Sequence, residues 1–419
     1  MNYNLLLRVL KAEVLPTVGS LEAGAIALAA AYASETLGGR FDSISIIVNP
    51  KVNTDGDNAV IPGTKETSLE IAAVLGAIKR QPEKQLSVLA SITTEELDQG
   101  KEFLKQKDVT ISIDDSKKGL WIEAYLRFGQ EECHVIIKDT HTNVVSITKN
   151  GQFIFKQDAS GETAKERAVF QGDEIRIADM ISIVEKMPWY EMEFLLDGVE
   201  MNCFAAEIGI ARKMGLGIGA FFHSLIAEGV LSDDIVNYAK MLTAAAADAR
   251  MFGENIKIMS CAGSAECGIA AILPVHAVGK KIGASKERLA RAIAISLGIT
   301  IYIKVRTDHL PALQGCPVAA VSGASAAITW LMNGDSTMIA KSMKNVIGNL
   351  AGMLGDDGKA EWGINLSIAA AVAVESSLMA QHHIVVPIHN GIIGDTIEET
   401  IKKLGQVSNP GMLHTDKVK

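Results

Sequence analysis

The part of the chain after Asp173 consists of runs of alanine, glycine and aliphatic residues at helical spacing, with almost no strand signal. Small side chains allow helix backbones to approach closely, and several runs are apolar on every side, which is typical of buried helices. We therefore predict a tight all-α domain. The predicted helices span 173–186, 191–211, 219–227, 233–249, 266–278, 286–300, 318–331, 336–350, 365–379 and 395–404.

The part of the chain before this mixes helical and strand patterns. Helices are predicted at 1–37, with a break near Pro16 to Gly19, and at 68–79 and 94–106, while 49–67 is predicted to be a loop. Alternating residues predict one strand at 41–48 and an antiparallel meander at 109–113, 120–128, 132–139, 144–149 and 152–156. The predicted fold class is α+β, with an α+β domain over 1–165 and an all-α domain over 166–419.

Charge and cysteine usage exclude several classes of protein. The net charge is −9 and no basic cluster occurs, so nucleic-acid binding is not expected. The sequence contains no run of about 18 or more uncharged apolar residues, so we predict no membrane span. Five scattered cysteines without a secretory signal indicate a reducing cytoplasm and no structural disulfides.

One short pattern occurs twice and opens an alanine-rich helix each time. Gly19-Ser20-Leu21-Glu22-Ala23-Gly24 is matched by Gly263-Ser264-Ala265-Glu266-Cys267-Gly268. In each copy the serine can cap the helix, the glutamate lies in its first turn, and the exposed N–H groups can bind an anion. Two ordinary capped helices are one interpretation. The other is a pair of helix starts that face one small ligand.

Further candidates surround these motifs. Arg250 ends a predicted helix, where it could hold a substrate carboxylate or only satisfy helix carbonyls. His141, Thr142 and Asn143 form a polar turn between two strands, and Gly63 and Thr64 belong to a Pro-Gly turn. No metal site is predicted at His382, His383 and His389, because the adjacent pair points in different directions.

With these residues in hand, the chain resembles the L-cysteine desulfidase and L-serine dehydratase-like family, in particular its UPF0597 branch. The resemblance covers nearly the whole length and depends on the order and spacing of short motifs. These motifs are Glu13-Val14-x-Pro16-x-x-Gly19 with Glu22, Val60-Ile61-Pro62-Gly63-Thr64, His141-Thr142-Asn143, Asn202-Cys203, Asp248-Ala249-Arg250-Met251, and Gly263-Ser264 with Gly268-Ile269.

The resemblance implies a reaction that removes hydrogen sulfide or water, and then ammonia, from an L-amino acid to give pyruvate. It also implies a [4Fe–4S] cluster with an open iron site, held by cysteine thiolates. Of the family's ligand positions only Cys316 is a cysteine here, and the others are Ser20, Gly355 and Trp362. Cys133, Cys203, Cys261 and Cys267 do not replace them by position, so we predict no cofactor and no metal.

We therefore predict a lyase acting on a small amino acid or hydroxy acid, at a site between the two domains. Arg250 and the helix starts would hold the carboxylate, Glu22 or Glu266 would be the general base, and Ser20 or His141 would assist the leaving group. Gly19, Gly63, Thr64, Thr142, Asn143, Gly263 and Ser264 complete the predicted site. The alternative is a degenerate member that binds a small acid without turnover. We expect a small-molecule ligand and no nucleic acid or membrane partner, and the sequence leaves a homodimer open.

Overall fold

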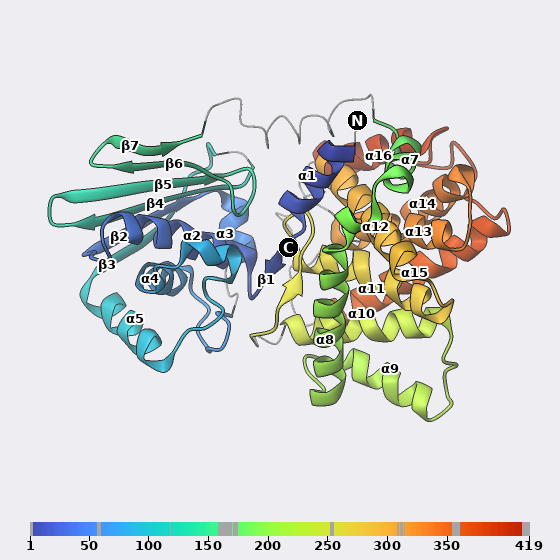
Figure 1. Cartoon of the computed structure of the whole chain (residues 1–419), viewed down its shortest axis with the longest axis horizontal. Coiled ribbons are helices and arrows are strands. Elements are labelled where there is room, and N and C mark those ends of the chain that lie inside the picture. Colours follow the sequence, from blue (N-terminus) through green and yellow to red (C-terminus); the bar gives the residue numbers. More distant parts are fainter. Residues whose placement is uncertain are drawn as a thin grey trace. The chain divides into compact units, whose positions relative to one another are not determined.

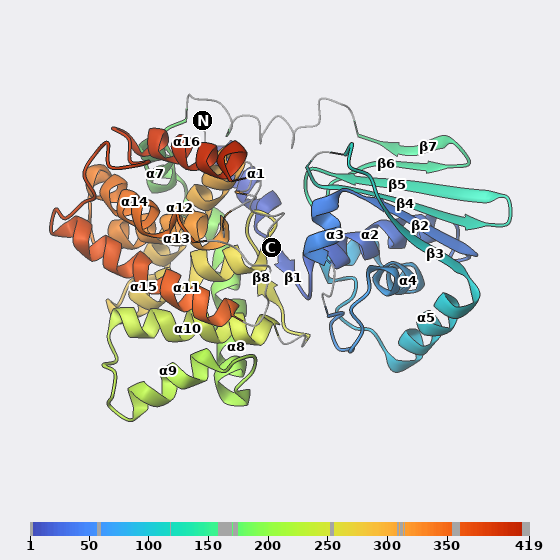
Figure 2. The same ribbon diagram turned by 180° about the vertical axis from the view of Figure 1, so that it is seen from behind.

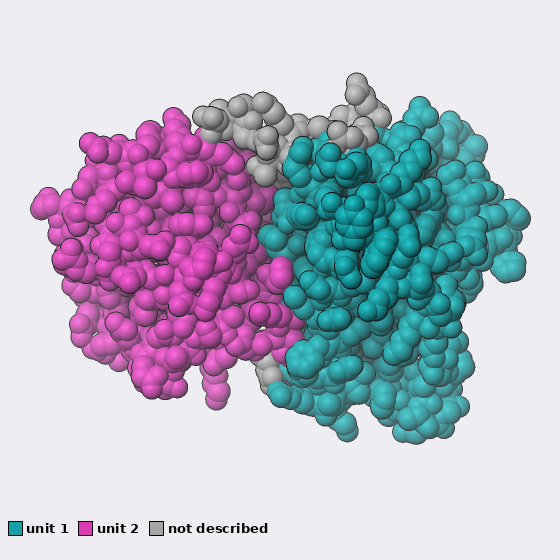
Figure 3. Space-filling model, in the orientation of Figure 1, with its two compact units in different colours: residues 1–15, 165–251, 258–419 teal, residues 16–164, 252–257 magenta. Residues whose placement is uncertain are grey.

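The computed structural model describes residues 3–56, 60–117, 119–157, 170, 175–251, 255–307, 310, 313, 315–353 and 361–412. The chain divides into two compact units, coloured separately in Figure 3. Unit 1 comprises residues 1–15, 165–251 and 258–419, and unit 2 comprises 16–164 and 252–257. The predicted α+β domain over 1–165 includes the first fifteen residues, whereas their contacts place them in the helical unit. The α+β fold class is confirmed.

Unit 2 is built on a six-stranded sheet with the strand order β3-β2-β4-β5-β6-β7 (Figure 1). Each strand predicted from alternation is present. Their bounds are β2 Ser43–Val48, β3 Asp108–Ile113, β4 Trp121–Phe128, β5 Glu131–Lys138, β6 Val144–Lys149 and β7 Gln152–Lys156. The helices of this unit are α2 Leu21–Thr36, α3 Pro50–Gly56, α4 Leu69–Lys79 and α5 Thr94–Gln106, with a 3₁₀ segment at Pro82–Ser87 and the short strand β1 at Pro16–Thr17.

Two details of the prediction for unit 2 are wrong. The strand β3 was placed beside β4 in the meander, but β2 lies between them and pairs with β3 in parallel. Alternation predicts that a segment is a strand, but it does not predict which strand it pairs with. A parallel pair needs a long crossover connection, which here contains the helices α3 to α5. The segment 49–67 was predicted to be a loop, but Pro50 opens the helix α3, since proline is well suited to the first helical position.

The helices α2 and α4 pack against the sheet and against each other (Figure 2). The strand residues Ile122, Ala124 and Leu126 are buried, which is the burial expected of every second residue. In α4, Gly76 lies directly on the backbone of α2. A Cβ atom at Gly76 would be 2.2 Å from the carbonyl oxygen of Ala27. The absence of a side chain there allows the two helices to approach closely.

Unit 1 is helical, as predicted. Its helices are α1 Tyr3–Glu13, α7 Ile177–Lys186, α8 Leu195–Arg212, α9 Ile218–Ala227, α10 Ile235–Met251, α11 Ala265–Lys281, α12 Lys286–Arg306, α13 Gly315–Leu331, α14 Ser336–Leu350, α15 Trp362–Gln381 and α16 Ile397–Gln406. The remaining elements are the short strand β8 at Ile258–Met259, a 3₁₀ turn at Trp189–Met192 and a π-helical turn at Val407–Gly411. The helices α11, α12, α13 and α15 are largely buried, and they form the core of the unit.

The helix α15 is long and apolar enough to cross a membrane by length and composition alone. However, 61% of its most apolar window is buried inside the structure, as in the core helix of a globular domain. Its composition is therefore explained by packing against its neighbours.

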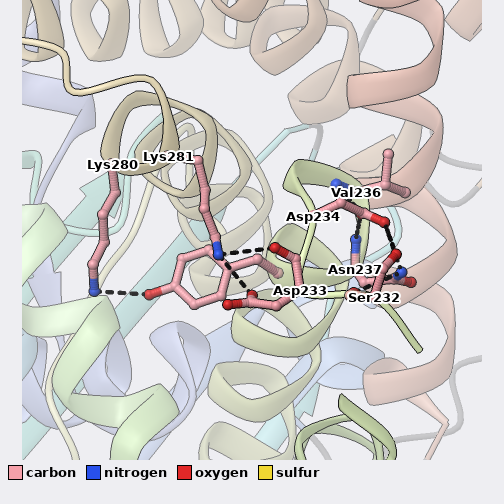
Figure 4. A network of polar contacts seen from close by, with 8 residues as sticks. Ser232, Asp233, Asp234, Val236, Asn237, Lys280 and Lys281 are labelled. Atoms are coloured by element: carbon pink, nitrogen blue, oxygen red, sulfur yellow. Dashed lines mark hydrogen bonds and ion pairs between the residues drawn. The ribbon is translucent and has the colours of Figure 1, made fainter. Parts of the chain in front are cut away.

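A polar network joins the start of α10 to the end of α11 (Figure 4). The Asp234 carboxylate accepts from the backbone N–H groups of Val236 and Asn237, which caps α10. Lys281 pairs with Asp233 at 2.7 Å, and Lys280 donates to the Tyr238 hydroxyl at 2.9 Å. These contacts fasten two helices whose other ends carry Arg250 and Ser264.

The close approach of α2 and α4 gives the first prediction. Replacing Gly76 by alanine gains about 1 kcal/mol of helix propensity, but it forces a methyl group into a backbone carbonyl, and overpacking costs about 1–3 kcal/mol. We expect the Gly76→Ala variant to unfold at a lower temperature, measured by circular dichroism. The control is Gly352→Ala, where a Cβ would meet nothing within 4 Å. Equal melting temperatures for the two variants would contradict this account.

Candidate functional site

The loop before α11 is a tight turn closed by its own backbone. The N–H of Cys261 donates to the carbonyl of Ser264 at 2.9 Å, and the N–H of Ser264 donates back at 3.0 Å. Gly263 adopts a φ of +74°, which favours glycine. The loop is held from outside by Asn202, whose amide oxygen accepts from the N–H of Met259, and by Leu15, whose carbonyl accepts from Ser260.

Ser264 makes three contacts through one hydroxyl group. The oxygen accepts from the N–H of Cys267 at 3.1 Å, which caps α11 as predicted. The hydroxyl donates to the Glu266 Oε2 atom at 2.8 Å. The Cys316 Sγ atom lies 3.0 Å away. Ser264 therefore holds the glutamate of its own helix and contacts the first turn of α13.

Arg250, in the last turn of α10, lies beside the same glutamate. Its Nε atom is 4.0 Å from Glu266 Oε1, and both side chains are 14% exposed. Within the described part of the chain this Nε is buried and has no hydrogen-bond acceptor. A buried donor without an acceptor is costly, and a ligand carboxylate would satisfy it.

Two further residues lie in this region that were not predicted to do so. Cys316 contacts Ser264, and the charge of Lys304 acts on the Cys316 thiol. The Cys316 thiol is hydrogen-bonded to Cys267, and this contact, with the charge of Lys304 and the Ser264 hydroxyl, lowers the pKa of Cys316 to about 7 despite burial. Burial raises the pKa of the Cys267 and Cys261 thiols. Lys304 is buried and interrupts the apolar run of α12, which is the one sequence signal that marked it.

The second copy of the pattern, in unit 2, has the same local geometry. Ser20 Oγ accepts from the N–H of Ala23 at 3.3 Å, so the predicted cap of α2 is confirmed. Its hydroxyl donates to Glu22 Oε2 at 2.8 Å. Glu22 Oε1 then lies 3.3 Å from His141 Nε2. Each serine thus holds a glutamate, and the second oxygen of each glutamate faces a basic side chain, His141 here and Arg250 in unit 1.

The Glu22 carboxylate is largely shielded from solvent beside His141. Burial alone would raise the pKa of Glu22, but the hydrogen bond and charge of His141, with the Ser20 and backbone hydrogen bonds, lower it to about 2. Glu22 is therefore ionised at neutral pH. A carboxylate with so low a pKa is a weak base, but it can orient a histidine ring.

The turn Pro62-Gly63-Thr64 packs beside the start of α2. A Cβ atom at Gly19 would be 2.5 Å from the Pro62 ring, so the Pro62-Gly63-Thr64 turn packs against the start of α2. The Thr64 hydroxyl donates to the carbonyl of Ile61 and closes that turn.

The turn that carries His141 is closed by its neighbours. The Asn143 amide donates to the carbonyl of Lys138, and the Thr142 carbonyl accepts from the N–H of Val144. Asn143 and Thr142 thus brace the turn that presents His141. That Gly19–Glu22 and Gly263–Gly268 share one ligand stays a prediction, because the two motifs belong to different units.

Comparisons with known proteins agree with the motifs. Residues 83–419 match the family described as serine dehydratase alpha chain. The chain is 40% identical over 415 residues to a UPF0597 protein of Clostridioides difficile, which covers 98% of this chain and 97% of that protein. It is 38% identical over 416 residues to one of Alkaliphilus oremlandii, with 99% and 96% covered. For one of Desulforapulum autotrophicum the identity is 35% over 428 residues, with 100% and 96% covered.

The fold and the motifs therefore define a protein of the serine dehydratase alpha-chain family. Within that family, the chain belongs to the UPF0597 group.

The family's iron–sulfur cluster does not fit the donors that the structure describes. The Ser20 hydroxyl is already bound to Glu22 and to the N–H of Ala23, and Trp362 offers an indole at the start of α15. Gly355 lies outside the described residues. Among the residues described, no group of three or more His, Cys, Asp or Glu side chains could hold a metal ion, and His389 faces Asp395 at an exposed position.

The low pKa of Glu22 gives the second prediction. Folding lowers this pKa from 4.5 to about 2, so the ionised form stabilises the fold above pH 4.5, and this contribution is lost as the pH falls towards 2. We expect the free energy of unfolding of Glu22→Gln to fall less steeply over this window than that of the wild type, measured by urea titration. Glu70→Gln is the control, because Glu70 follows the capping Ser68 of α4 at the same spacing. Parallel curves for wild type and Glu22→Gln would rule out the pair as a source of acid sensitivity.

Proposed function

We propose that the protein is a serine dehydratase-like lyase that acts on a small L-amino acid, L-serine or L-cysteine, without an iron–sulfur cluster. The products would be pyruvate, ammonia, and water or hydrogen sulfide. Membership of the serine dehydratase alpha-chain family supports the reaction class. The observation that carries the proposal is the buried Arg250 Nε atom, which has no acceptor in the described part of the chain and lies beside the start of α11.

The substrate carboxylate would be held by Arg250 and by the N–H groups at the start of α11. Guanidinium groups bind carboxylates through charge-assisted hydrogen bonds, and a helix start adds a favourable dipole. The Glu266 Oε1 atom lies 4.0 Å from Arg250 Nε, beyond hydrogen-bond distance. Glu266 would therefore orient the guanidinium group and leave its Nε–H free to bind the substrate. A preorganised cation here would also stabilise negative charge that develops on the carboxylate as the α-proton leaves.

Proton transfers would be divided between the acidic and basic side chains. Glu266 would accept the proton from Cα, the C–H electron pair would form the double bond, and the β-substituent would depart as it takes up a proton. Glu22, ionised and held by Ser20, would keep the His141 ring in place. The resulting enamine would take up water and release ammonia to give pyruvate.

The alternative function is a binding protein for a small carboxylic acid. It is favoured by the replacement of cluster-ligand cysteines by Ser20 and Trp362, combined with an intact Arg250 cluster. The two functions differ in turnover. Pyruvate formed from L-serine or L-cysteine after treatment with an iron chelator would support the lyase. Calorimetric binding of small L-amino acids without pyruvate would support the binding protein, and neither binding nor turnover would reject both.

The anchoring role of Arg250 gives the third prediction. Removing one partner of a charge-assisted hydrogen bond costs about 1.5–3 kcal/mol, so Arg250→Met should weaken binding of a carboxylate ligand about tenfold to a hundredfold. Isothermal titration calorimetry measures this with the amino acid that binds the wild type. Arg212→Met is the matched control, because Arg212 is in the last turn of α8 and is exposed. Unchanged affinity in Arg250→Met would remove Arg250 from the site.

The donor set gives the fourth prediction. Three cysteine ligands are the practical minimum for a cubane with one open iron, and a serine hydroxyl binds iron poorly at neutral pH. We expect protein purified without oxygen to be colourless, to contain no stoichiometric iron, and to release no sulfide from L-cysteine at a family-like rate. Iron analysis and absorption spectra check this. A brown protein with about four irons per chain would overturn it.

A further inference from the structure

The helix α9 is apolar along its whole length but is hardly buried. It contains no Asp, Glu, Lys or Arg, and of its ten residues, all of them described, only Gly219 is buried. A helix that is apolar on every side is normally enclosed by other elements. This one packs against α10 and α8 and lies at the lower edge of unit 1 in Figures 1 and 2. Its composition therefore indicates a further partner for its outer side.

The inner side of α9 is fixed firmly to α10. The Asp248 carboxylate of α10 accepts from the N–H of Gly219 at 3.0 Å. A Cβ atom at Gly219 would be 2.3 Å from the Cβ atom of Ala245, so the two helices are in close contact there. The Lys240 Nζ atom of α10 lies 4.5 Å from the centre of the Phe222 ring. The outer side of α9 is thus held on a rigid support, which lowers the entropic cost of docking a partner.

The outer side of α9 presents large apolar side chains. Phe221 is 54% exposed, and the half-buried Ile218 and Leu225 lie on the same face of the helix by their spacing. Leu216 before the helix and Val230 after it are 54% and 66% exposed. Together these side chains offer about 400 Å² of apolar surface, if each offers about 150–200 Å² when fully exposed. A stable dimer buries about 800 Å² on each partner, more than half of it apolar, so the patch has the size of an interface centre.

The charges at the two ends of α9 are unfavourably placed for the helix itself. Glu228 is its C-cap residue. Lys213 lies at its start, since the Lys213 carbonyl oxygen would be 3.9 Å from a Cβ atom at Gly217, the N-cap residue. Both charged side chains are exposed. The helix dipole favours anions at the start of a helix and cations at its end, which is the reverse of this arrangement.

A second copy of α9, packed antiparallel, would make both charges favourable. A twofold axis brings the same patch of both partners together, so Glu228 of each chain comes to the start of the other helix and Lys213 to its end. Each charge then has a favourable helix dipole and an opposite charge nearby. The face is therefore complementary to itself, with an apolar centre and ends of opposite charge.

We propose that the outer side of α9, with Leu216 and Val230, is the contact by which two copies of this chain form a twofold dimer. Phe221, near the middle of the helix, would lie close to the axis at the centre of the interface. Aromatic residues in that position commonly contribute most of the binding free energy. The inference does not depend on the proposed reaction, because α9 carries none of the residues assigned to it.

The test measures the oligomeric state of the full chain by sedimentation velocity over a wide range of protein concentrations. We expect the wild type to be a dimer and Phe221→Glu to raise its dissociation constant about thirtyfold or more. Phe153→Glu is the matched control, because Phe153 is 58% exposed but belongs to β7 of unit 2. Circular dichroism melting curves check that both variants fold. A monomeric wild type would overturn the proposal, as would a dimer that Phe221→Glu leaves intact or that Phe153→Glu dissociates.

A charge exchange tests the antiparallel arrangement separately. At low salt, Lys213→Glu and Glu228→Lys should each weaken the dimer about twofold to tenfold, because each brings like charges together across the axis. The double variant should regain most of the wild-type affinity, since the two charges then exchange places. A double variant weakened by the product of the two single effects would show that these charges do not meet, and it would overturn the antiparallel pairing of α9.

Discussion

The close approach of helices to neighbouring backbone, made possible by glycine, is the constraint on which the rest of the structure depends. Gly76 rests on the backbone of Ala27 in unit 2, and in unit 1 a Cβ at Gly268 would be 1.9 Å from the carbonyl of Met259. Such contacts leave no space for a side chain, so the helix α2 and the start of α11 are held in place by packing. The candidate functional residues lie at these starts.

A single serine hydroxyl organises each of these helix starts. It satisfies one backbone N–H of the first turn and holds the glutamate two residues further on. The glutamate keeps one oxygen for a side chain from elsewhere in the same unit. That partner is a histidine in unit 2 and an arginine in unit 1, so the same local arrangement holds an imidazole ring in one unit and a guanidinium group in the other.

The position of Cys316 explains how this chain differs from the cluster-containing pattern that its family resemblance implies. The retained cysteine lies 3.0 Å from the Ser264 hydroxyl oxygen. Ser20 is likewise used as a cap. Two of the positions that the resemblance assigns to a cluster, Cys316 and Ser20, are thus engaged in protein contacts.

The sequence by itself determined the elements, because periodicity, capping residues and turn residues act locally. Ser20 and Ser264 were identified as caps, and α5, α14, β6 and β7 have the predicted bounds. Only the tertiary structure decided which elements are neighbours: that β2 separates β3 from β4, that His141 faces Glu22, and that Cys316 meets Ser264. These pairings join residues far apart in the chain, and packing of whole helices and strands selects them, which no local pattern records.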